Sequence, residues 1–524
     1  MSVGLVRENL RLDRMVGSEN VQTNVESDIV VPDSKPDIHN ILSAEGNVNI
    51  ADKEIIQGKV VVDGTVNYKV LYTSNDPDKL LHSMNASASF NQSIEMDNVD
   101  GMMVPEVNCN IEHLDLSIMN ERKISAQAIL NINGKVFKTE EMDVVKDVDG
   151  VEDVQALKDT ISYDSLVGNN SSQTVLRESF ELGEEDSEIV DVLESNGTAT
   201  ITEKRVTDNK VIIGGNVNLN MLYETEEPRN PIHEVKHEIP FNHFIEIPKA
   251  ENNMDCKVDV QVNETYTNIK KNINEENKVY DVEVVLKANV MVYNKAEKEV
   301  LLDVYSPSRK LNIQTSNLKF LKNVGRNSSN AVIKETIDTP SEYPSIFRVF
   351  TVKARPVVTD YKLIDNKNII EGFIDANVLY MADNEEMQVY SFNQEVPFRH
   401  YVEMEGLQED MTADVKLGIE NVDFSAINSK QVEAKFNLHA YSEVNKEEEM
   451  EVLVNLEDLG EQEDDDSKAS ITIYFVQDGD NLWDIAKRYN TTVKEILETN
   501  DISQSQSVKV GDKIIIQKNY EYKF

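Results

Sequence analysis

Apolar and polar residues alternate along much of this chain with a period of two. The clearest run covers residues 215–223, in which large apolar side chains are separated mainly by asparagine, and residues 372–380 repeat the pattern. Because successive side chains of a β-strand point to opposite faces, this period predicts strands with one face toward a core and one toward solvent. Half-polar strands of this kind favour antiparallel sheets in sandwich-like layers over a buried parallel sheet.

The pattern recurs because the chain contains three copies of one unit. A shift of 151 residues, followed by one of 157, aligns residues 16–95 with two later segments without a gap. The aligned identities include Gly64, Gly215 and Gly372; Phe90, Phe241 and Phe398; and Tyr72, Tyr223 and Tyr380. The chain is therefore predicted to be mainly β, with three tandem antiparallel sandwich-like repeats. We place these at residues 8–158, 159–315 and 316–456.

Glycine recurs in the middle of a predicted strand in each repeat. Glycine destabilises a strand interior, so a matched glycine predicts a bulge, a bend or a close approach of backbone. The matched tyrosine and phenylalanine are most simply core residues.

A glutamate also recurs, at Glu95, Glu246 and Glu403. A charged residue at a matched position is seldom there for packing. One interpretation, which we favour, is that these carboxylates accept backbone hydrogen bonds or pair with the matched lysines Lys59, Lys210 and Lys367. The other is a direct binding role.

The pattern changes after the third repeat. Residues 457–468 contain seven acidic side chains in twelve positions. Like charges at this density repel one another, so residues 457–469 are predicted to form an extended, solvated linker. A small separate domain, residues 470–518, follows it.

This last domain reads as strand, helix, helix and strand. Residues 471–476 alternate as a strand, and residues 482–489 carry apolar side chains at helical i, i+3, i+4 and i+7 spacing. Asp480 is placed to cap the first helix, and Thr492 with Glu495 forms a capping box for the second. Residues 513–516 close the domain as a strand, which gives a small α+β (βααβ) module.

The module resembles a LysM domain. The residues that carry the resemblance are Gly479, Asp480, Leu482, Trp483, Ile485, Ala486, Asn500, Gly511, Asp512 and Ile514. In this family, two loops form a shallow groove for N-acetylglucosamine chains. The resemblance implies a groove formed by Asp478, Gly479, Asp480, Asn481, Leu482, Asp501, Ile502, Ser503 and Gln504. The sequence departs from the family pattern at Asn481, where threonine is common, and at residues 503–506, which replace a proline-containing loop.

Trp483 is the only tryptophan of the chain. It lies one residue, and therefore about 100°, away from the apolar stripe of its predicted helix, so we expect it to be half exposed. Such a tryptophan is either an anchor for a binding partner or the edge of the small core, and the sequence leaves both interpretations open.

The net charge excludes several classes of function. Lysine and arginine total 52 and aspartate and glutamate total 95, which gives a net charge of −43. This acidity argues against nucleic-acid binding and against docking on anionic lipid, and it predicts that partners of the repeats present a basic face. No secretory signal or transmembrane pattern is evident, and two cysteines cannot form a disulfide framework, so a reducing cytoplasm is expected.

No constellation of catalytic residues is evident either. His233 and His237 lie four residues apart but lack a convincing third metal ligand. The chain has neither a glycine-rich phosphate loop nor a nucleophile elbow. We therefore expect no catalytic residue, no metal and no cofactor, and a protein that is not an enzyme.

Three β repeats, an acidic linker and a LysM-like module together resemble SipL-type spore coat assembly proteins, whose repeats are SPOCS domains. Residues 31–38 read as the typical start of a SPOCS domain, from which residues 184–189 and 340–346 of the later copies depart. The resemblance implies a non-enzymatic scaffold that recruits or anchors coat proteins at the forespore surface, in the mother-cell cytoplasm. It also implies that LysM binds the coat-basement morphogenetic ATPase (SpoIVA), with other coat proteins as candidate partners of the repeats. The alternative is a protein that binds peptidoglycan or its lipid-linked precursor through LysM.

Overall fold

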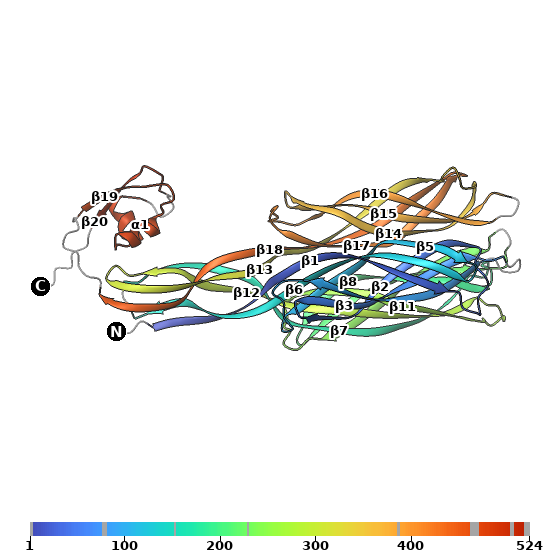
Figure 1. The fold of residues 1–524 in the computed structure, drawn as a ribbon, viewed down its shortest axis with the longest axis horizontal. Coiled ribbons are helices and arrows are strands. Elements are labelled where there is room, and N and C mark those ends of the chain that lie inside the picture. The colour runs from blue at the N-terminus through green and yellow to red at the C-terminus, as the bar shows by residue number, and fades with distance from the viewer. Residues whose placement is uncertain are drawn as a thin grey trace.

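A computed structural model describes residues 4–75, 81–150, 153–227, 230–384, 388–461, 471–502 and 508–517. It confirms a mainly β fold, in which three six-stranded repeats precede a small domain of two strands and two helices. Figure 1 shows an elongated molecule with the three repeats packed together at one end and the small domain at the other. Neither helix of the small domain is long and apolar enough to span a membrane.

The first repeat consists of two three-stranded antiparallel sheets. Its strands are β1 (Gly4–Val30), β2 (Asn40–Ile56), β3 (Lys59–Thr73), β4 (Leu81–Glu95), β5 (Val104–Asn120) and β6 (Lys123–Asp149). One sheet has the order β1-β6-β5 and the other the order β2-β3-β4. Gln57 and Gly58, which join β2 to β3, both have positive φ, as a two-residue hairpin turn requires.

The second and third repeats have the same topology. The second comprises β7 (Gln155–Glu181), β8 (Asp191–Thr207), β9 (Lys210–Glu224), β10 (Ile232–Glu246), β11 (Asp255–Lys270) and β12 (Val279–Tyr305). The third comprises β13 (Arg309–Asp338), β14 (Ile346–Ile364), β15 (Lys367–Ala382), β16 (Val389–Glu403), β17 (Thr412–Asn428) and β18 (Gln431–Glu461). Their sheets have the orders β11-β12-β7 and β10-β9-β8, then β13-β18-β17 and β14-β15-β16.

Each repeat is a sandwich with its core between the two sheets. In the first repeat the inward side chains of β3 and β6 are buried together: Val60, Val62, Val66, Tyr68, Val70 and Tyr72 with Ile124, Ala126, Ala128, Leu130 and Ile132. They follow the period of two that the sequence predicts, and burial of this apolar surface is the main force that holds the sheets together. The hydroxyl of Tyr72 satisfies its polar end by donating to the carbonyl oxygen of Pro36 at 3.1 Å.

The matched glycines mark both a bulge and a close approach, as predicted. Each glycine lies opposite the matched phenylalanine of the next strand: Gly64 and Phe90, Gly215 and Phe241, Gly372 and Phe398. A Cβ at Gly64 would lie 2.6 Å from the ring of Phe90 and 2.8 Å from the carbonyl oxygen of Asn49. The register of β2 shifts beside this glycine, between Ile50 and Asp52. Only glycine leaves room for the ring to cover the strand.

The long first and last strands of each repeat continue beyond the sandwich as a two-stranded ribbon. The ribbons comprise residues 4–14 with 138–149, 155–165 with 294–305, and 309–322 with 446–461. Together they form a narrow stalk between the sandwiches and the small domain (Figure 1).

Equivalent residues of the three repeats meet in two shared apolar clusters. Leu12, Tyr163 and Phe320 are buried together in the stalk. Leu71, Leu222 and Leu379 are buried together between the sandwiches. Because each set is related by the same shifts of 151 and 157 residues, the repeats are arranged about an approximate threefold axis.

The long strands β7 and β13 cross the positions at which the sequence divides the repeats. Positions 158/159 and 315/316, where the sequence divides the repeats, lie within β7 and β13. We propose boundaries between the long strands instead, that is, between residues 149 and 155 and between residues 305 and 309.

The predicted linker begins too early. Residues 457–461 belong to β18 and pair with β13, so they are not a solvated linker. Arg309 neutralises one of their acids, since its Nη2 lies 2.7 Å from Oδ2 of Asp458. The remainder of the predicted linker, residues 462–469, lies outside the described residues.

The small domain has the predicted order of elements. It consists of β19 (Ile471–Phe475), α1 (Leu482–Arg488), α2 (Val493–Thr499) and β20 (Lys513–Gln517), and the two strands pair antiparallel. The capping box of α2 is confirmed, with Thr492 and Glu495 each accepting a backbone N–H of the other at 3.1 Å. The predicted cap of α1 is wrong by one residue. Asn481 caps the helix, because Asp480 accepts hydrogen bonds from Tyr474 and Gln477 instead.

Candidate functional site

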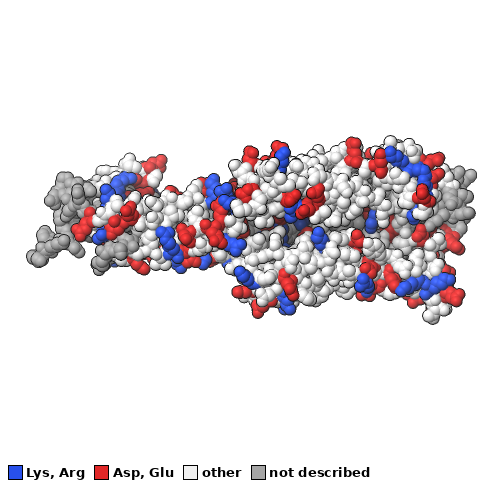
Figure 2. All heavy atoms as spheres, turned by 60° about the horizontal axis from the view of Figure 1, so that its bottom comes forward, with Lys and Arg blue, Asp and Glu red and all other residues white. Residues whose placement is uncertain are grey.

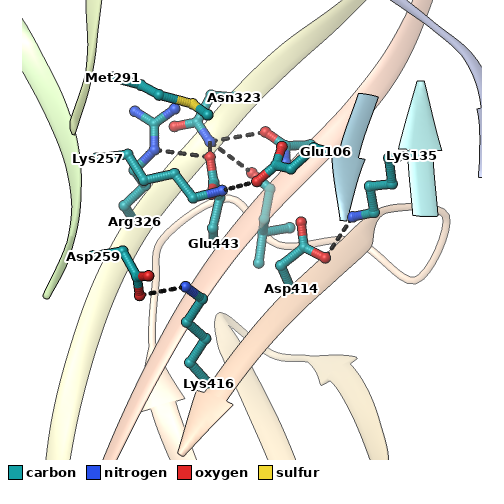
Figure 3. Close-up of polar contacts among 12 residues, drawn as sticks. Glu106, Lys135, Lys257, Asp259, Met291, Asn323, Arg326, Asp414, Lys416 and Glu443 are labelled. Carbon is teal, nitrogen blue, oxygen red and sulfur yellow. Dashed lines mark hydrogen bonds and ion pairs between the residues drawn. The ribbon is translucent and has the colours of Figure 1, made fainter. Parts of the chain in front are cut away.

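Charged residues from all three repeats meet where the sandwiches contact one another (Figure 3). Lys257 of β11 forms ion pairs with Glu106 of β5 at 2.8 Å and with Glu443 of β18 at 2.9 Å. Another ion pair joins Lys135 of β6 to Asp414 of β17. These five residues connect the first repeat to the second, the second to the third and the third to the first. We call them the ion-pair ring.

The ring exists because equivalent positions carry different charges. Glu106, Lys257 and Asp414 are equivalent, and each lies opposite an equivalent residue of the next strand: Lys135, Met291 and Glu443 respectively. In the third repeat this places two carboxylates opposite each other, which is unfavourable within one sheet. Asp414 is neutralised by Lys135 of the first repeat, and Glu443 is shared by Lys257 of the second repeat and Arg326 of the third. The third repeat therefore relies on its neighbours for part of the charge that neutralises these two carboxylates.

Glu443 is buried and shared by two cations. Its side chain is 6% exposed, and its Oε1 accepts a hydrogen bond from Nε of Arg326 at 2.9 Å while Lys257 contacts Oε2. Burial raises the pKa of Glu443, but the charges of Lys257 and Arg326 outweigh it and hold the pKa below its usual range. Arg326 also pairs with Asp255 at 2.7 Å and lies 4.8 Å over the ring of Tyr293. This cluster fastens the third repeat to the second.

A second charged cluster lies between the sandwiches. Glu45, Asn196 and Lys353 are equivalent positions of the three repeats. Nζ of Lys353 lies 3.0 Å from Oε1 of Glu45 and also pairs with Glu194. Asn196 donates to Oε2 of Glu45 at 2.8 Å and accepts from Nζ of Lys69 at 2.5 Å. An acid, an amide and a base at equivalent positions make contacts that three identical repeats could not make.

Several of these residues line a cavity of about 1020 Å³ between the sandwiches. Burial raises the pKa of Glu194, whereas for Glu45 the charges of Lys353 and Lys69 outweigh burial and lower the pKa. Lys353 therefore shares its charge between the two acids. Within the described residues, no three histidine, cysteine or acidic side chains are grouped so that they could hold a metal ion.

The matched glutamates lie at strand ends opposite the matched lysines. Lys59 pairs with Glu95 at 2.8 Å and Lys367 pairs with Glu403 at 3.8 Å. In the second repeat, Lys210 instead lies 5.9 Å from the ring centroid of Phe244, on the strand that ends at Glu246. Two of the three thus make the cross-strand contact that we favour from the sequence. A binding role for these exposed carboxylates stays a prediction.

The two neighbouring histidines, His233 and His237, have different protein partners. Nε2 of His233 lies 2.8 Å from the side-chain amide of Asn230. His237 stacks on Phe180 with centroids 3.8 Å apart and bonds to the hydroxyl of Tyr280. Each ring therefore has a structural role.

Two further histidines at matched positions bond to serines of the long first strand. Nε2 of His243 lies 2.6 Å from Oγ of Ser172, and Nε2 of His400 lies 2.8 Å from Oγ of Ser329. The first repeat has Gln92 at this position. Burial lowers the pKa of both histidines, so the folded protein favours their neutral form.

Acid is expected to destabilise the protein through His243 and His400. Their lowered pKa means that the unfolded chain binds these protons more readily, so their contribution to stability is present above the unfolded value of about 6.5 and is lost as the pH falls from there through the lower folded pKa. Replacing both with glutamine, as in the first repeat, should reduce the drop in melting temperature between about pH 7.5 and about pH 5.5. Equal drops in the variant and the unchanged protein would contradict this assignment.

The loop after β19 is open to solvent. Asp478, Gly479 and Asn481 are exposed, and the space beside Gly479, where a Cβ would point, is empty. Asp501 is exposed at the end of α2, whereas Asp480 is held by Arg488 at 3.5 Å. Leu482 packs against the small core, and the backbone of Ile502 bonds back to α2. Ser503 and Gln504 lie outside the described residues.

Trp483 is half-buried, and its contact lies within the chain. Its indole Nε1 donates to Oδ2 of Asp303 at 2.8 Å, and Nζ of Lys487 lies 2.7 Å from both carboxylate oxygens of Asp303. The ring of Tyr305 meets Trp483 edge to face at 5.0 Å, and its hydroxyl donates to the carbonyl oxygen of Thr491 at 2.9 Å. Asp303 and Tyr305 end β12, so the small domain is docked on the tip of the stalk. Sequence reasoning missed both stalk residues.

Charges of both signs are spread over the surface. Figure 2 shows acidic and basic side chains interspersed along the sandwiches and the stalk on the face that it displays. The excess of acid is therefore not gathered into one patch on that face. The expectation that partners of the repeats present a basic face stays a prediction.

The fold and the contacts define a class of protein: three β sandwiches joined into one body by inter-repeat ion pairs, with a small βααβ domain docked on a common stalk. A family model described as SipL, SPOCS domain, matches residues 37–119, 188–270 and 345–427, and a LysM domain model matches residues 474–517. The chain is thus a protein of three SipL SPOCS domains and a C-terminal LysM domain, as its sequence indicates. No curated protein and no solved structure matches it.

The SPOCS matches cover the four middle strands of each repeat. Residues 37–119 contain β2 to β5, and the other two matches contain β8 to β11 and β14 to β17. The long strands that form the stalk lie outside the matched ranges.

Proposed function

We propose that this protein is a non-enzymatic scaffold in spore coat morphogenesis, which recruits or anchors coat proteins at the forespore surface from the mother-cell cytoplasm. SPOCS domains associate it with sporulation, and LysM is a binding module for proteins or glycans. The observation that carries the proposal is the ion-pair ring, because, together with the shared apolar clusters, it joins three domains into one body. A rigid body with one module at its end is suited to holding partners in fixed positions.

LysM would bind the coat-basement morphogenetic ATPase (SpoIVA), and the SPOCS domains would contact other coat proteins. The α1 face of LysM supports a protein-binding role. It offers an indole ring beside a lysine ammonium group, and it already binds a protein strand, β12, through both. Tryptophan is among the residues enriched in the hot spots of protein interfaces.

The alternative is that LysM binds peptidoglycan, its lipid-linked precursor or free N-acetylglucosamine chains. The observation that favours it is the exposed loop at Asp478 and Gly479, which docking on the stalk leaves uncovered.

The two functions predict different responses of two full-length variants. Trp483→Ala should weaken binding to the purified ATPase by roughly 2 kcal/mol or more, because it removes an aromatic anchor, and should leave glycan binding unchanged. Asp478→Arg, on the exposed loop, should do the reverse. Binding is measured by calorimetry with the ATPase and with N-acetylglucosamine oligomers, and by sedimentation with peptidoglycan. Saturable glycan binding without any binding to the ATPase would refute the scaffold.

A further inference from the structure

The docked strand shows what chemistry the α1 face of LysM accepts. Asp303 and Tyr305 are two residues apart on β12, so both side chains leave the same face of the strand. The carboxylate of Asp303 accepts from the indole N–H of Trp483 and from the ammonium group of Lys487. Such charge-assisted hydrogen bonds are stronger than neutral ones.

Tyr305 completes the contact. Its side chain is 6% exposed and is part of the apolar core of LysM. Burial, and then the nearby charges of Asp303 and Glu495, raise its pKa to about 12, so its hydroxyl remains a donor to the carbonyl oxygen of Thr491. One carboxylate and one phenol thus bind the indole N–H of Trp483, the ammonium group of Lys487 and the carbonyl oxygen of Thr491.

Only one of the three ribbons offers this pair. The equivalents of Asp303 and Tyr305 are Asp147 and Asp149 in the first repeat, and Asn455 and Glu457 in the third. An aromatic residue stands at the second position in the second repeat alone. The ribbon on which LysM is docked is therefore the one that combines a carboxylate with a phenol at these two positions.

We propose that Trp483, Lys487 and the Thr491 carbonyl form a recognition site for extended protein segments that carry an acidic residue and a tyrosine two positions apart. In the isolated chain β12 occupies this site. This inference rests on the proposed function, because it takes a coat protein to be the partner of LysM. To bind at this site, that protein must displace β12. Because β12 is tethered to LysM, it competes at a high effective concentration, and binding of the partner is weakened accordingly.

The single tryptophan of the chain reports on docking directly. In the full-length protein, Asp303→Asn with Tyr305→Ala should expose Trp483, which shifts its fluorescence emission to the red and increases quenching by acrylamide. Asp147→Asn, the equivalent change in the first ribbon, should alter neither. Circular dichroism checks that both variants keep their β structure, and Lys487→Met gives an independent way to loosen the contact from the LysM side. Unchanged emission in the folded double variant and in Lys487→Met would overturn the proposal.

A synthetic peptide of residues 299–308 then tests recognition of the segment itself. Added to the double variant, it should reverse the emission shift saturably, whereas a peptide with asparagine and alanine in place of the two side chains should not. Equal responses to the two peptides would overturn the proposal.

A third experiment measures binding of the ATPase to the double variant and to the unchanged chain. The ATPase should bind the double variant roughly tenfold or more tightly than the unchanged chain, because a competing segment has been removed. Tighter binding supports competition at this face, and equal affinity for the two chains refutes it. If the ATPase binds neither chain, the proposed function fails while the peptide experiment still decides the recognition site.

Discussion

Gly372→Ala and Gly215→Ala are each expected to lower the free energy of unfolding by about 3 kcal/mol or more. A Cβ at Gly372 would overlap the carbonyl oxygen of Val357, and one at Gly215 would overlap that of Thr200. It would also lie 3.0 Å from the ring of Phe398 in the first case and 2.9 Å from that of Phe241 in the second. The new methyl group would have backbone on one side and a core ring on the other. No small shift can therefore relieve the overlap.

The residue that precedes Gly215 in the same strand supplies a matched control. A Cβ at Gly214 would come no closer than 3.6 Å to its neighbours, which is ordinary contact. Gly214→Ala should therefore change stability little, or raise it, because alanine reduces the freedom of the unfolded chain. Urea denaturation followed by far-ultraviolet circular dichroism measures both variants. Equal effects at Gly214 and Gly215 would show that strand propensity, and not close approach, explains the matched glycine.

The fold of each repeat could be predicted because its signals are local and occur three times. Alternation marks strands, and the shifts of 151 and 157 residues hold from residue 16 to residue 95. The stalk could not be predicted in this way. Leu12, Tyr163 and Phe320 alternate with polar residues just as sandwich residues do, and nothing local shows that their face meets two other ribbons. Residues 457–461 were misassigned for a related reason, since Arg309, which neutralises Asp458, lies far away in the sequence.

The LysM domain could be located from its motif, but the docking contact could not. Asp303 and Trp483 are 180 residues apart, and each is unremarkable within its own segment. The ion-pair ring did leave a signal. Glu106, Lys257 and Asp414 are matched positions with opposite charges. Such a difference marks a candidate contact, but the exposed set Glu54, Arg205 and Lys362 also differs in sign, so the interface itself could not be located in this way.

Lys257→Met should be the most damaging single change in the ion-pair ring, with an expected loss of about 3 kcal/mol or more. Lys257 is 15% exposed and is held between Glu106 and Glu443, whose charges outweigh burial and raise its pKa. Removing it leaves Glu106, which is 22% exposed, without this partner and leaves Glu443 to Arg326 alone. Breaking one member of a buried pair is costly because the remaining charge stays desolvated. Methionine keeps most of the volume, so the loss reports charge and not a cavity.

Lys416→Met is the matched control, because Lys416 pairs with Asp259 at 2.7 Å but is 42% exposed. An exposed pair contributes up to about 1 kcal/mol, so this variant should remain close to the unchanged protein in urea denaturation. Adding Glu106→Gln to Lys257→Met should recover part of the loss, since it removes the orphaned charge, and the shortfall from additivity measures the coupling across the first and second repeats. Purely additive losses would mean that Glu106 and Lys257 do not couple the two repeats, which would leave the apolar clusters and the contacts of Asn196 to hold them. A recovered loss would mean that the different charges at equivalent positions fix the order in which three similar domains pack.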